Sequence, residues 1–289
     1  MGGTGKSVVV TYLIDLLQKT KTLATLSRGY GRKTKGLRIA DINDTAATLG
    51  DEPFQFLNRY SDLRVIVSEN RLLGMEALKL LNPVPEVVIM DDIMQHRWVK
   101  PSLLIMTTDY KNPYFKDYIF PIGGLREFKS GVNRADLILV TRSPSNLSME
   151  KKVNFLKGMK SKIPVFFTTI KYAQFLHKKN QSISDLELNR GNFILVTGIA
   201  DSSKLVDYLK TTFGGFKHLK FSDHHHFSNN DIHRILNASE GKIIVTTEKD
   251  YGRLSPLLKS DNLFYIPVKL SFFSKKEETE FNKRVKSFS

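Results

Sequence analysis

The stretch Gly2-Gly3-Thr4-Gly5-Lys6-Ser7 stands at the start of this 289-residue chain, and an amphipathic segment over 7–19 follows it directly. In a phosphate-binding loop, glycines let backbone N–H groups point at phosphate oxygens, and a lysine reaches the terminal phosphates. A hydroxyl then serves Mg²⁺, and the following helix turns its positive end to the phosphate. The stretch supplies each part and therefore predicts a P-loop. The alternative is a glycine-rich terminus that only happens to precede a helix.

Beyond the loop, short apolar runs alternate with longer helical patterns, which is typical of an α/β protein. Many of the runs are continuous rather than alternating, so we expect strands buried on both faces of a parallel sheet. Helices are expected over 7–19, 70–81 and 147–160. The expected strands are 23–27, 64–67, 87–90, 103–106, 137–141, 165–170, 193–197, 243–247 and 263–268.

A second unit is expected to begin near Arg190, because the segment 177–190 is polar and a new strand–loop–helix cycle follows it. We therefore assign 1–170 to a P-loop core, 171–190 to a connection and 191–289 to a smaller α/β domain. The charged segment from Phe272 onward is expected to fray or to lie on the surface.

The chain is strongly basic and contains no cysteine: 44 Lys and Arg against 29 Asp and Glu give a net charge of +15. Disulfides and thiolate metal sites are excluded. Such a charge indicates an anionic partner: nucleic acid, a membrane surface or a phosphorylated substrate. The basic residues are scattered along the chain, which weakens the nucleic-acid interpretation. No apolar run is long enough to span a bilayer.

A second candidate element for phosphate chemistry is the strand 87–90, which ends in Asp91 and Asp92. An apolar strand ending in aspartate is what a Mg²⁺-binding carboxylate of a P-loop enzyme requires. Further polar clusters stand at expected strand ends, where open α/β sheets bind ligands. They are 27–32, 50–53, 123–127, 223–226 and 248–250, while Gln95 and His96, which follow the two aspartates, strengthen the assignment of the strand 87–90.

The cluster Asp223-His224-His225-His226 admits two interpretations. It could hold zinc, although the chain has no cysteine and no second histidine pair at helical spacing. We favour a histidine next to the phosphate site, tuned by a carboxylate. The segment Glu248-Lys249-Asp250 could be a solvated strand end.

Seven short blocks, in this order, resemble the tetraacyldisaccharide 4'-kinase family, the lipid A 4'-kinases of Gram-negative bacteria. They are GGTGKS, SRGYGR, GDEP, DDIMQH, GGLRE, DHHHF and TTEKD, and they run from residue 2 to residue 250. The resemblance implies a kinase that moves the γ-phosphoryl group of ATP to the 4'-hydroxyl of tetraacyldisaccharide 1-phosphate and forms lipid IVA. The rivals are another P-loop kinase with a soluble substrate and an inactive nucleotide-binding fragment.

The resemblance also implies roles for residues at the matching positions. Asp51, paired with His224, corresponds to the catalytic carboxylate that accepts the proton of the sugar hydroxyl. The other implied catalytic residues are Lys6, Arg71, Arg126 and Glu127. The implied ATP-binding residues are Gly2, Gly3, Thr4, Gly5, Lys6 and Ser7. The implied Mg²⁺ ligands are Ser7, Glu52, Asp91 and Asp92, and Gln95 and His96 are implied to hold substrate.

The resemblance further implies a two-stranded hinge between the domains, which we place at 165–170 and 263–268. Family members begin with a membrane-associating helix and the first core strand, and both are expected to be missing here, in an N-terminally truncated chain. The implied partners are the acylated disaccharide phosphate and an anionic membrane surface, with no nucleic acid. A monomer, peripheral on the cytoplasmic face of the inner membrane, is expected.

Overall fold

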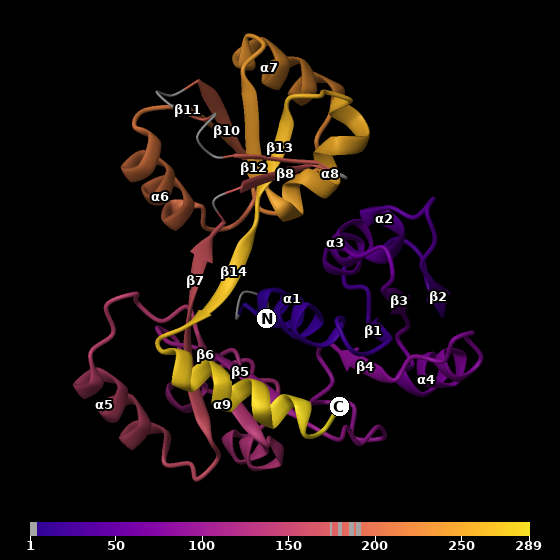
Figure 1. The fold of residues 1–289 in the computed structure, drawn as a ribbon, viewed down its shortest axis with the longest axis vertical. Coiled ribbons are helices and arrows are strands. Elements are labelled where there is room, and N and C mark those ends of the chain that lie inside the picture. Colours follow the sequence, from indigo (N-terminus) through magenta and orange to yellow (C-terminus); the bar gives the residue numbers. More distant parts are fainter. Residues whose placement is uncertain (1–4, 174, 179–180, 185–187, 189–191) are drawn as a thin grey trace.

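The computed structural model describes residues 5–173, 175–178, 181–184, 188 and 192–289. The expected ATP-binding residues Gly2, Gly3 and Thr4 lie outside the described residues. Two bodies are visible in Figure 1: a first body with both termini, and a second body at the top, which is mainly orange. Strands β7 and β14 run between them.

The first body contains a sheet with the strand order β2-β3-β1-β4. Its strands are β1 (Leu23–Ser27), β2 (Arg38–Ile39), β3 (Arg64–Val67) and β4 (Val87–Met90). Strand β1 pairs in parallel with β3 and β4, and every residue of β1 is buried. Helices α1 (Lys6–Leu17), α2 (Ala46–Leu49), α3 (Asp51–Arg59) and α4 (Arg71–Lys79) belong to this part of the chain. The parallel, fully buried central strand confirms the α/β prediction.

A further sheet of the first body has the order β14-β7-β6-β5. Its strands are β5 (Ile105–Asp109), β6 (Leu137–Thr141), β7 (Val165–Tyr172) and β14 (Val268–Phe272), and helix α5 (Met149–Met159) lies between β6 and β7 in the chain. Two 3₁₀ turns, η1 (Tyr114–Lys116) and η2 (Lys129–Arg134), flank the loop that follows β5. Strand β5 begins two residues later than expected.

The second body is built on a six-stranded sheet, β11-β10-β12-β13-β8-β9. Its parallel strands are β10 (Phe193–Thr197), β11 (Lys217–Lys220), β12 (Ile243–Thr247) and β13 (Leu263–Ile266). Helices α7 (Asn229–Ser239) and α8 (Glu248–Leu258) share one apolar core with the sheet, and α6 (Ser203–Phe213) shares another. The sheet is thus covered on both faces, which explains its continuous apolar strands.

The division at 170 and 190 stays a prediction, and the structure differs from it in detail. Strands β8 (Phe175–Lys178) and β9 (Gln181–Ser184) lie where a connection was expected, and they extend the second sheet. The expected return strand at 263–268 is split between two sheets. Its first part, β13, belongs to the second body, and β14 pairs antiparallel with β7 from Val268↔Tyr172 to Phe272↔Thr168.

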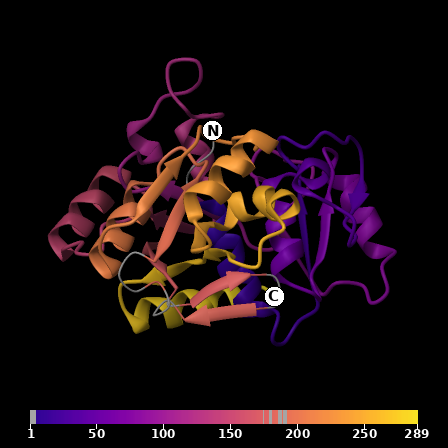
Figure 2. The same ribbon diagram turned by 90° about the horizontal axis from the view of Figure 1, so that it is seen from above.

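Of the two expectations for the C-terminal segment, fraying was wrong, whereas a surface position is confirmed: every residue of 275–286 except Phe281 and Val285 is at least partly exposed. Residues Lys275–Lys286 form helix α9, which lies beside α1 in both Figure 1 and Figure 2. Phe281 is fully buried with Phe166, and the Tyr12 hydroxyl donates to Asn282 at 2.8 Å. The charged residues around Phe281 and Val285 concealed a narrow apolar stripe, and these two residues, four apart, lie on one face of the helix.

Candidate active site

The phosphate-loop lysine lies on the first turn of α1. Gly5 precedes it with a φ of 74°, a left-handed conformation that glycine adopts without strain. The Nζ atom of Lys6 lies 2.7 Å from Oδ1 of Asp92, just beyond the end of β4. Ser7 is half-buried on the same helical turn. Lys6 of the predicted loop and the predicted strand-end carboxylate therefore meet in space.

Asp92 receives a second cation from a distant part of the chain. Nη1 of Arg126 donates to Oδ2 of Asp92 at 2.5 Å, so each carboxylate oxygen contacts one cation. Burial raises the pKa of Asp92, but the hydrogen bonds from Lys6 and Arg126 outweigh it and lower this pKa to about 2. Asp92 is thus ionised and holds two cationic side chains near the phosphate loop.

Asp91 has a different environment. Burial raises its pKa, and the nearby charges of Asp92 and Glu52 raise it further, while Lys6 opposes them. A half-buried carboxylate whose loss of solvation is not offset by Lys6 fits a site for a cation. Among the described residues, no group of three or more Asp, Glu or His side chains is arranged to hold a metal ion alone. Mg²⁺ does not need one, because it is usually bound through one or two carboxylates, waters and substrate phosphates.

The expected catalytic pair is formed across the two bodies. Oδ2 of Asp51, on the first turn of α3, lies 3.1 Å from Nδ1 of His224, in the loop between β11 and α7. Gly50 before it has a φ of 93°, and a Cβ there would lie 2.8 Å from the carbonyl oxygen of Tyr30. The blocks SRGYGR and GDEP are therefore packed backbone to backbone, which fixes the start of α3.

No sequence motif predicted Arg253, the residue that contacts both Asp51 and His224. Arg253, on α8, donates from Nε to Oδ1 of Asp51 at 3.1 Å, and its Nη2 contacts both Oδ2 of Asp51 and Nδ1 of His224. Burial raises the pKa of Asp51, but the hydrogen bonds and charge of Arg253 outweigh burial and lower it. A local signal for Arg253 is its position three residues after Asp250, one helical turn along α8, but this spacing does not indicate Asp51 as its partner.

The interpretation of 248–250 as a solvated strand end was wrong. Asp250 is fully buried, and its Oδ2 accepts from the backbone N–H of Gly198 and the Thr247 hydroxyl, both at 2.8 Å. Lys249 forms an ion pair with Glu52 at 2.5 Å, so this expected metal ligand is neutralised by a lysine. The segment is the N-terminus of α8, where carboxylates are favoured by the helix dipole.

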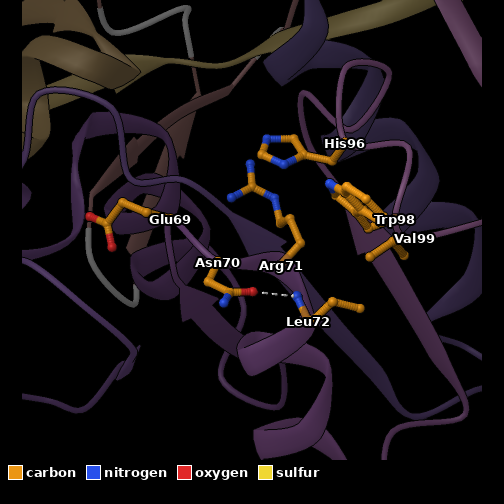
Figure 3. A pocket seen from close by; sticks show the side chains of 7 residues that line it. All are labelled: Glu69, Asn70, Arg71, Leu72, His96, Trp98 and Val99. Atoms are coloured by element: carbon orange, nitrogen blue, oxygen red, sulfur yellow. Dashed lines mark hydrogen bonds between the residues drawn. The ribbon is translucent and has the colours of Figure 1, made fainter.

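Arg71 and His96 border a cavity of about 380 Å³. Its lining residues are Glu69, Asn70, Arg71, Leu72, His96, Trp98 and Val99. Figure 3 shows the Arg71 guanidinium and the His96 ring close together, with Trp98 beside His96. Arg71 donates to the carbonyls of Ser68 at 2.5 Å and Asp91 at 3.3 Å, and burial lowers its pKa. Arg71 thus connects this cavity to the strand end that carries the aspartates.

Gln95 and Glu127 contact each other rather than Lys6 or Asp92. Nε2 of Gln95 donates to Glu127 at 3.1 Å, and Nη2 of Arg134 contacts both carboxylate oxygens of Glu127, at 2.9 and 2.7 Å. These contacts tie the segment after β4 to the loop that carries Arg126. Glu127 is therefore placed to position Arg126.

His225 has a structural environment. Its Nε2 lies 3.0 Å from Asp231, its Nδ1 lies 3.2 Å from the Ser222 hydroxyl, and its ring packs against Phe221 and Phe227. Asp231 also closes the capping box of α7 with Ser228. His225 thereby orders the loop that presents His224, and the described residues give no support to the zinc alternative.

The helix after Gly5 begins with a lysine, and carboxylates lie at the end of a nearby parallel strand. This arrangement defines the class of P-loop enzymes, which transfer or hydrolyse nucleotide phosphoryl groups. Within that class, the chain belongs to the tetraacyldisaccharide-1-P 4'-kinase family, whose model matches residues 1–287. The order of the seven blocks thus identified the family correctly.

Several relatives carry the name tetraacyldisaccharide 4'-kinase. One from Flavobacterium johnsoniae is 42% identical over 276 residues, which cover 95% of this chain and 81% of the relative. Another, from Cytophaga hutchinsonii, is 37% identical over 286 residues, 96% of this chain and 81% of the relative. Among solved structures, the LpxK of Aquifex aeolicus, described as an "apo" form in complex with ATP, matches with a TM-score of 0.77 and 28% identity. That match covers 99% of this chain and 85% of the other.

Proposed function

We propose that this chain transfers the γ-phosphoryl group of ATP to the 4'-hydroxyl of tetraacyldisaccharide 1-phosphate, forming lipid IVA in lipid A biosynthesis. Membership of the kinase family supports this reaction. The observation that carries it is the 3.1 Å contact between Asp51 and His224, which come from different bodies. An ionised carboxylate backed by an imidazole is suited to accept the proton of an attacking hydroxyl.

Each residue of the site has a proposed part in the transfer. The 4'-oxygen forms a bond to the γ-phosphorus, its proton passes to Asp51, and the bond to the β-phosphate oxygen breaks to release ADP. Lys6 and Arg126 carry the positive charge that the transferred group requires in the transition state. Asp92 holds both cations in place, at 2.7 and 2.5 Å. Arg253 orients Asp51, and Glu127 positions Arg126.

Mg²⁺ fits the oxygen donors of the site, with Asp91 and Ser7 as its proposed ligands and Glu52 and Asp92 as neighbouring carboxylates. When bound, the ion would neutralise negative charge on the phosphate groups during transfer. Gln95, Arg71 and His96 are proposed to line the approach of the lipid-linked sugar. The cavity beside Arg71 and His96 supports this assignment.

The proposed partners are the acylated disaccharide phosphate and the anionic surface of the bilayer that contains it. The net charge of +15 supports attraction to such a surface. Within the part of the chain that the structure describes, no helix is long and apolar enough to cross a membrane. We propose a monomer that works peripherally on the cytoplasmic face of the inner membrane, with no nucleic acid as partner.

The test is transfer of γ-labelled phosphate from ATP to tetraacyldisaccharide 1-phosphate in detergent micelles. We expect a product with one added phosphate at the 4' position, identified by tandem mass spectrometry. Labelling of soluble sugars or nucleosides alone would support the rival kinase. ATP binding without any transfer would support the inactive nucleotide-binding fragment.

A further inference from the structure

The loop between η1 and η2 forms a compact projection, which we call the finger, residues 117–125. Its two arms are joined by backbone hydrogen bonds between Tyr118 and Leu125 at 2.9 Å and between Leu125 and Phe120 at 2.8 Å. At its base, the carboxylate of Asp117 accepts from the backbone N–H groups of Tyr118 and Gly124 at 2.7 and 3.0 Å. The finger thus has a defined conformation that holds its tip, 120–123, outward.

The finger carries a concentration of large apolar side chains that face solvent. Within the finger, Phe120 is 66% exposed, Ile122 is 81% exposed and Tyr118 is 63% exposed; Phe128, three residues beyond it, is 75% exposed. Single exposed apolar residues are ordinary on protein surfaces, but several on one ordered loop indicate an interaction site. Exposing them to water is unfavourable by about 25 cal/mol per Å² of apolar surface, so an apolar phase is the environment they favour.

Cations surround the base of the finger. Lys116 and Lys129 are exposed on either side of it, and Nζ of Lys129 lies 5.1 Å from the centre of the Tyr118 ring. Arg126, next to the finger, contacts Asp92 of the candidate active site. Segments that enter the interfacial region of a bilayer typically carry aromatic and aliphatic side chains at the tip and lysines at the base. The lysines then reach the lipid phosphates.

From this juxtaposition we propose that the finger inserts Phe120 and Ile122 into an anionic lipid leaflet while Lys116 and Lys129 contact the lipid phosphates. The proposal rests on the proposed function, because a substrate with four acyl chains resides in a bilayer. It commits to the leaflet itself rather than to the acyl chains of the substrate. Insertion of the finger would also bring Arg126 and Asp92 to the depth of the lipid headgroups.

The first test uses the absence of cysteine from the chain. Ile122→Cys is labelled with a nitrobenzoxadiazole fluorophore and mixed with substrate-free vesicles of 70% phosphatidylcholine and 30% phosphatidylglycerol. We expect a blue shift and a severalfold rise in emission, both reduced by added salt. Leu80→Cys, at a site that is 86% exposed, is the matched control and should show neither. An unchanged spectrum at position 122, or a shift without vesicles at high protein concentration, would overturn the proposal; the latter would indicate a second copy of the chain.

The second test compares Ile122→Asp with Leu80→Asp by vesicle sedimentation. The wild-type side chains, isoleucine and leucine, are isomers, and Ile122 and Leu80 are similarly exposed, at 81% and 86%. We expect roughly tenfold weaker partitioning for Ile122→Asp and wild-type partitioning for Leu80→Asp, with unfolding midpoints unchanged. Equal partitioning of the two variants would overturn the proposal. If Ile122→Asp changed only the KM for micellar substrate, the finger would contact the acyl chains of the substrate instead. The proposed function would fail in a different experiment, in which wild-type protein did not phosphorylate micellar substrate. That result is independent of whether the finger inserts into vesicles.

Discussion

The guanidinium of Arg253, on helix α8 of the second body, contacts both carboxylate oxygens of Asp51, on the first turn of α3 in the first body. Two further ion pairs join the same helices, Glu52 with Lys249 at 2.5 Å and Arg59 with Glu248 at 3.5 Å. A Cβ on Gly252 would lie only 3.1 Å from the Phe54 ring, so the helices approach closely there. The candidate base is thus held in place by the second body.

Replacing Arg253 by alanine is expected to lower kcat about a hundredfold, because a small displacement of a reacting group is enough for such a loss. Asp51 would lose the donors that fix both of its oxygens. Arg253→Lys should restore little, since a lysine cannot form the same two-pronged contact. Arg64→Ala, at the exposed first residue of β3, is the control and should retain full turnover. Unimpaired kcat in Arg253→Ala would contradict the positioning role.

The same contact predicts a shift in pH dependence. Arg253 lowers the pKa of Asp51 against the effect of burial, so its removal leaves burial to raise that pKa. In Arg253→Gln, the acidic limb of the kcat/KM profile should therefore move to higher pH. The measurement is the pH profile of residual activity beside that of the wild type. An acidic limb at the same pH in both would show that Asp51 does not control it.

Asp51→Asn is expected to reduce turnover by about 10² to 10⁴, the usual contribution of a general base. ATP binding should persist, because the loop residues Gly5, Lys6 and Ser7 are unaltered. Turnover and nucleotide affinity, the latter by calorimetry, are measured separately. Asp62→Asn, an exposed aspartate before β3, provides the control. Near-normal turnover in Asp51→Asn would remove Asp51 from its assigned role.

Asp92 is expected to make the stability of the protein depend on acid pH. Its folded-state pKa of about 2 is below the ordinary value of 3.8. The folded state therefore binds this proton less readily, so the contribution to stability is present above pH 3.8 and is lost as the pH falls towards 2. Asp92→Asn should be less stable than the wild type at neutral pH, and the difference should shrink in that acid window. Urea unfolding at several pH values tests this, and a pH-independent difference would contradict it.

The C-terminal helix should be a major source of stability for the first body. Phe281 is fully buried against Tyr12, Phe166 and Phe272, so Phe281→Ala is expected to lower the free energy of unfolding by about 3–5 kcal/mol. Phe288→Ala, two residues beyond the helix and 52% exposed, should change it by less than about 0.5 kcal/mol. Denaturant unfolding gives both values. Similar values for the two variants would mean that α9 does not belong to the cooperative core.

The sequence by itself determined the α/β class, the family and most of the strands, because continuous apolar runs and short glycine, lysine and aspartate motifs are local signals. Leu23–Ser27, Val87–Met90 and Phe193–Thr197 follow from such runs and have the expected bounds. Lys6 and Asp92 were also predictable as members of one site, since P-loops and strand-end carboxylates occur together at one edge of a parallel sheet.

Only the tertiary structure decided which partner each charged residue has. Arg253 is separated from Asp51 by 202 residues in the chain, and Arg126 from Asp92 by 34. No local pattern encodes such a pairing, because it depends on how distant segments pack: α3 against α8 in the first case, and two loops of the first body in the second. The same reason applies to α9, whose charged sequence conceals the two residues that reach the core. Local sequence periodicity specifies an element and its buried face, whereas the partner of that face is fixed only when the whole chain is packed.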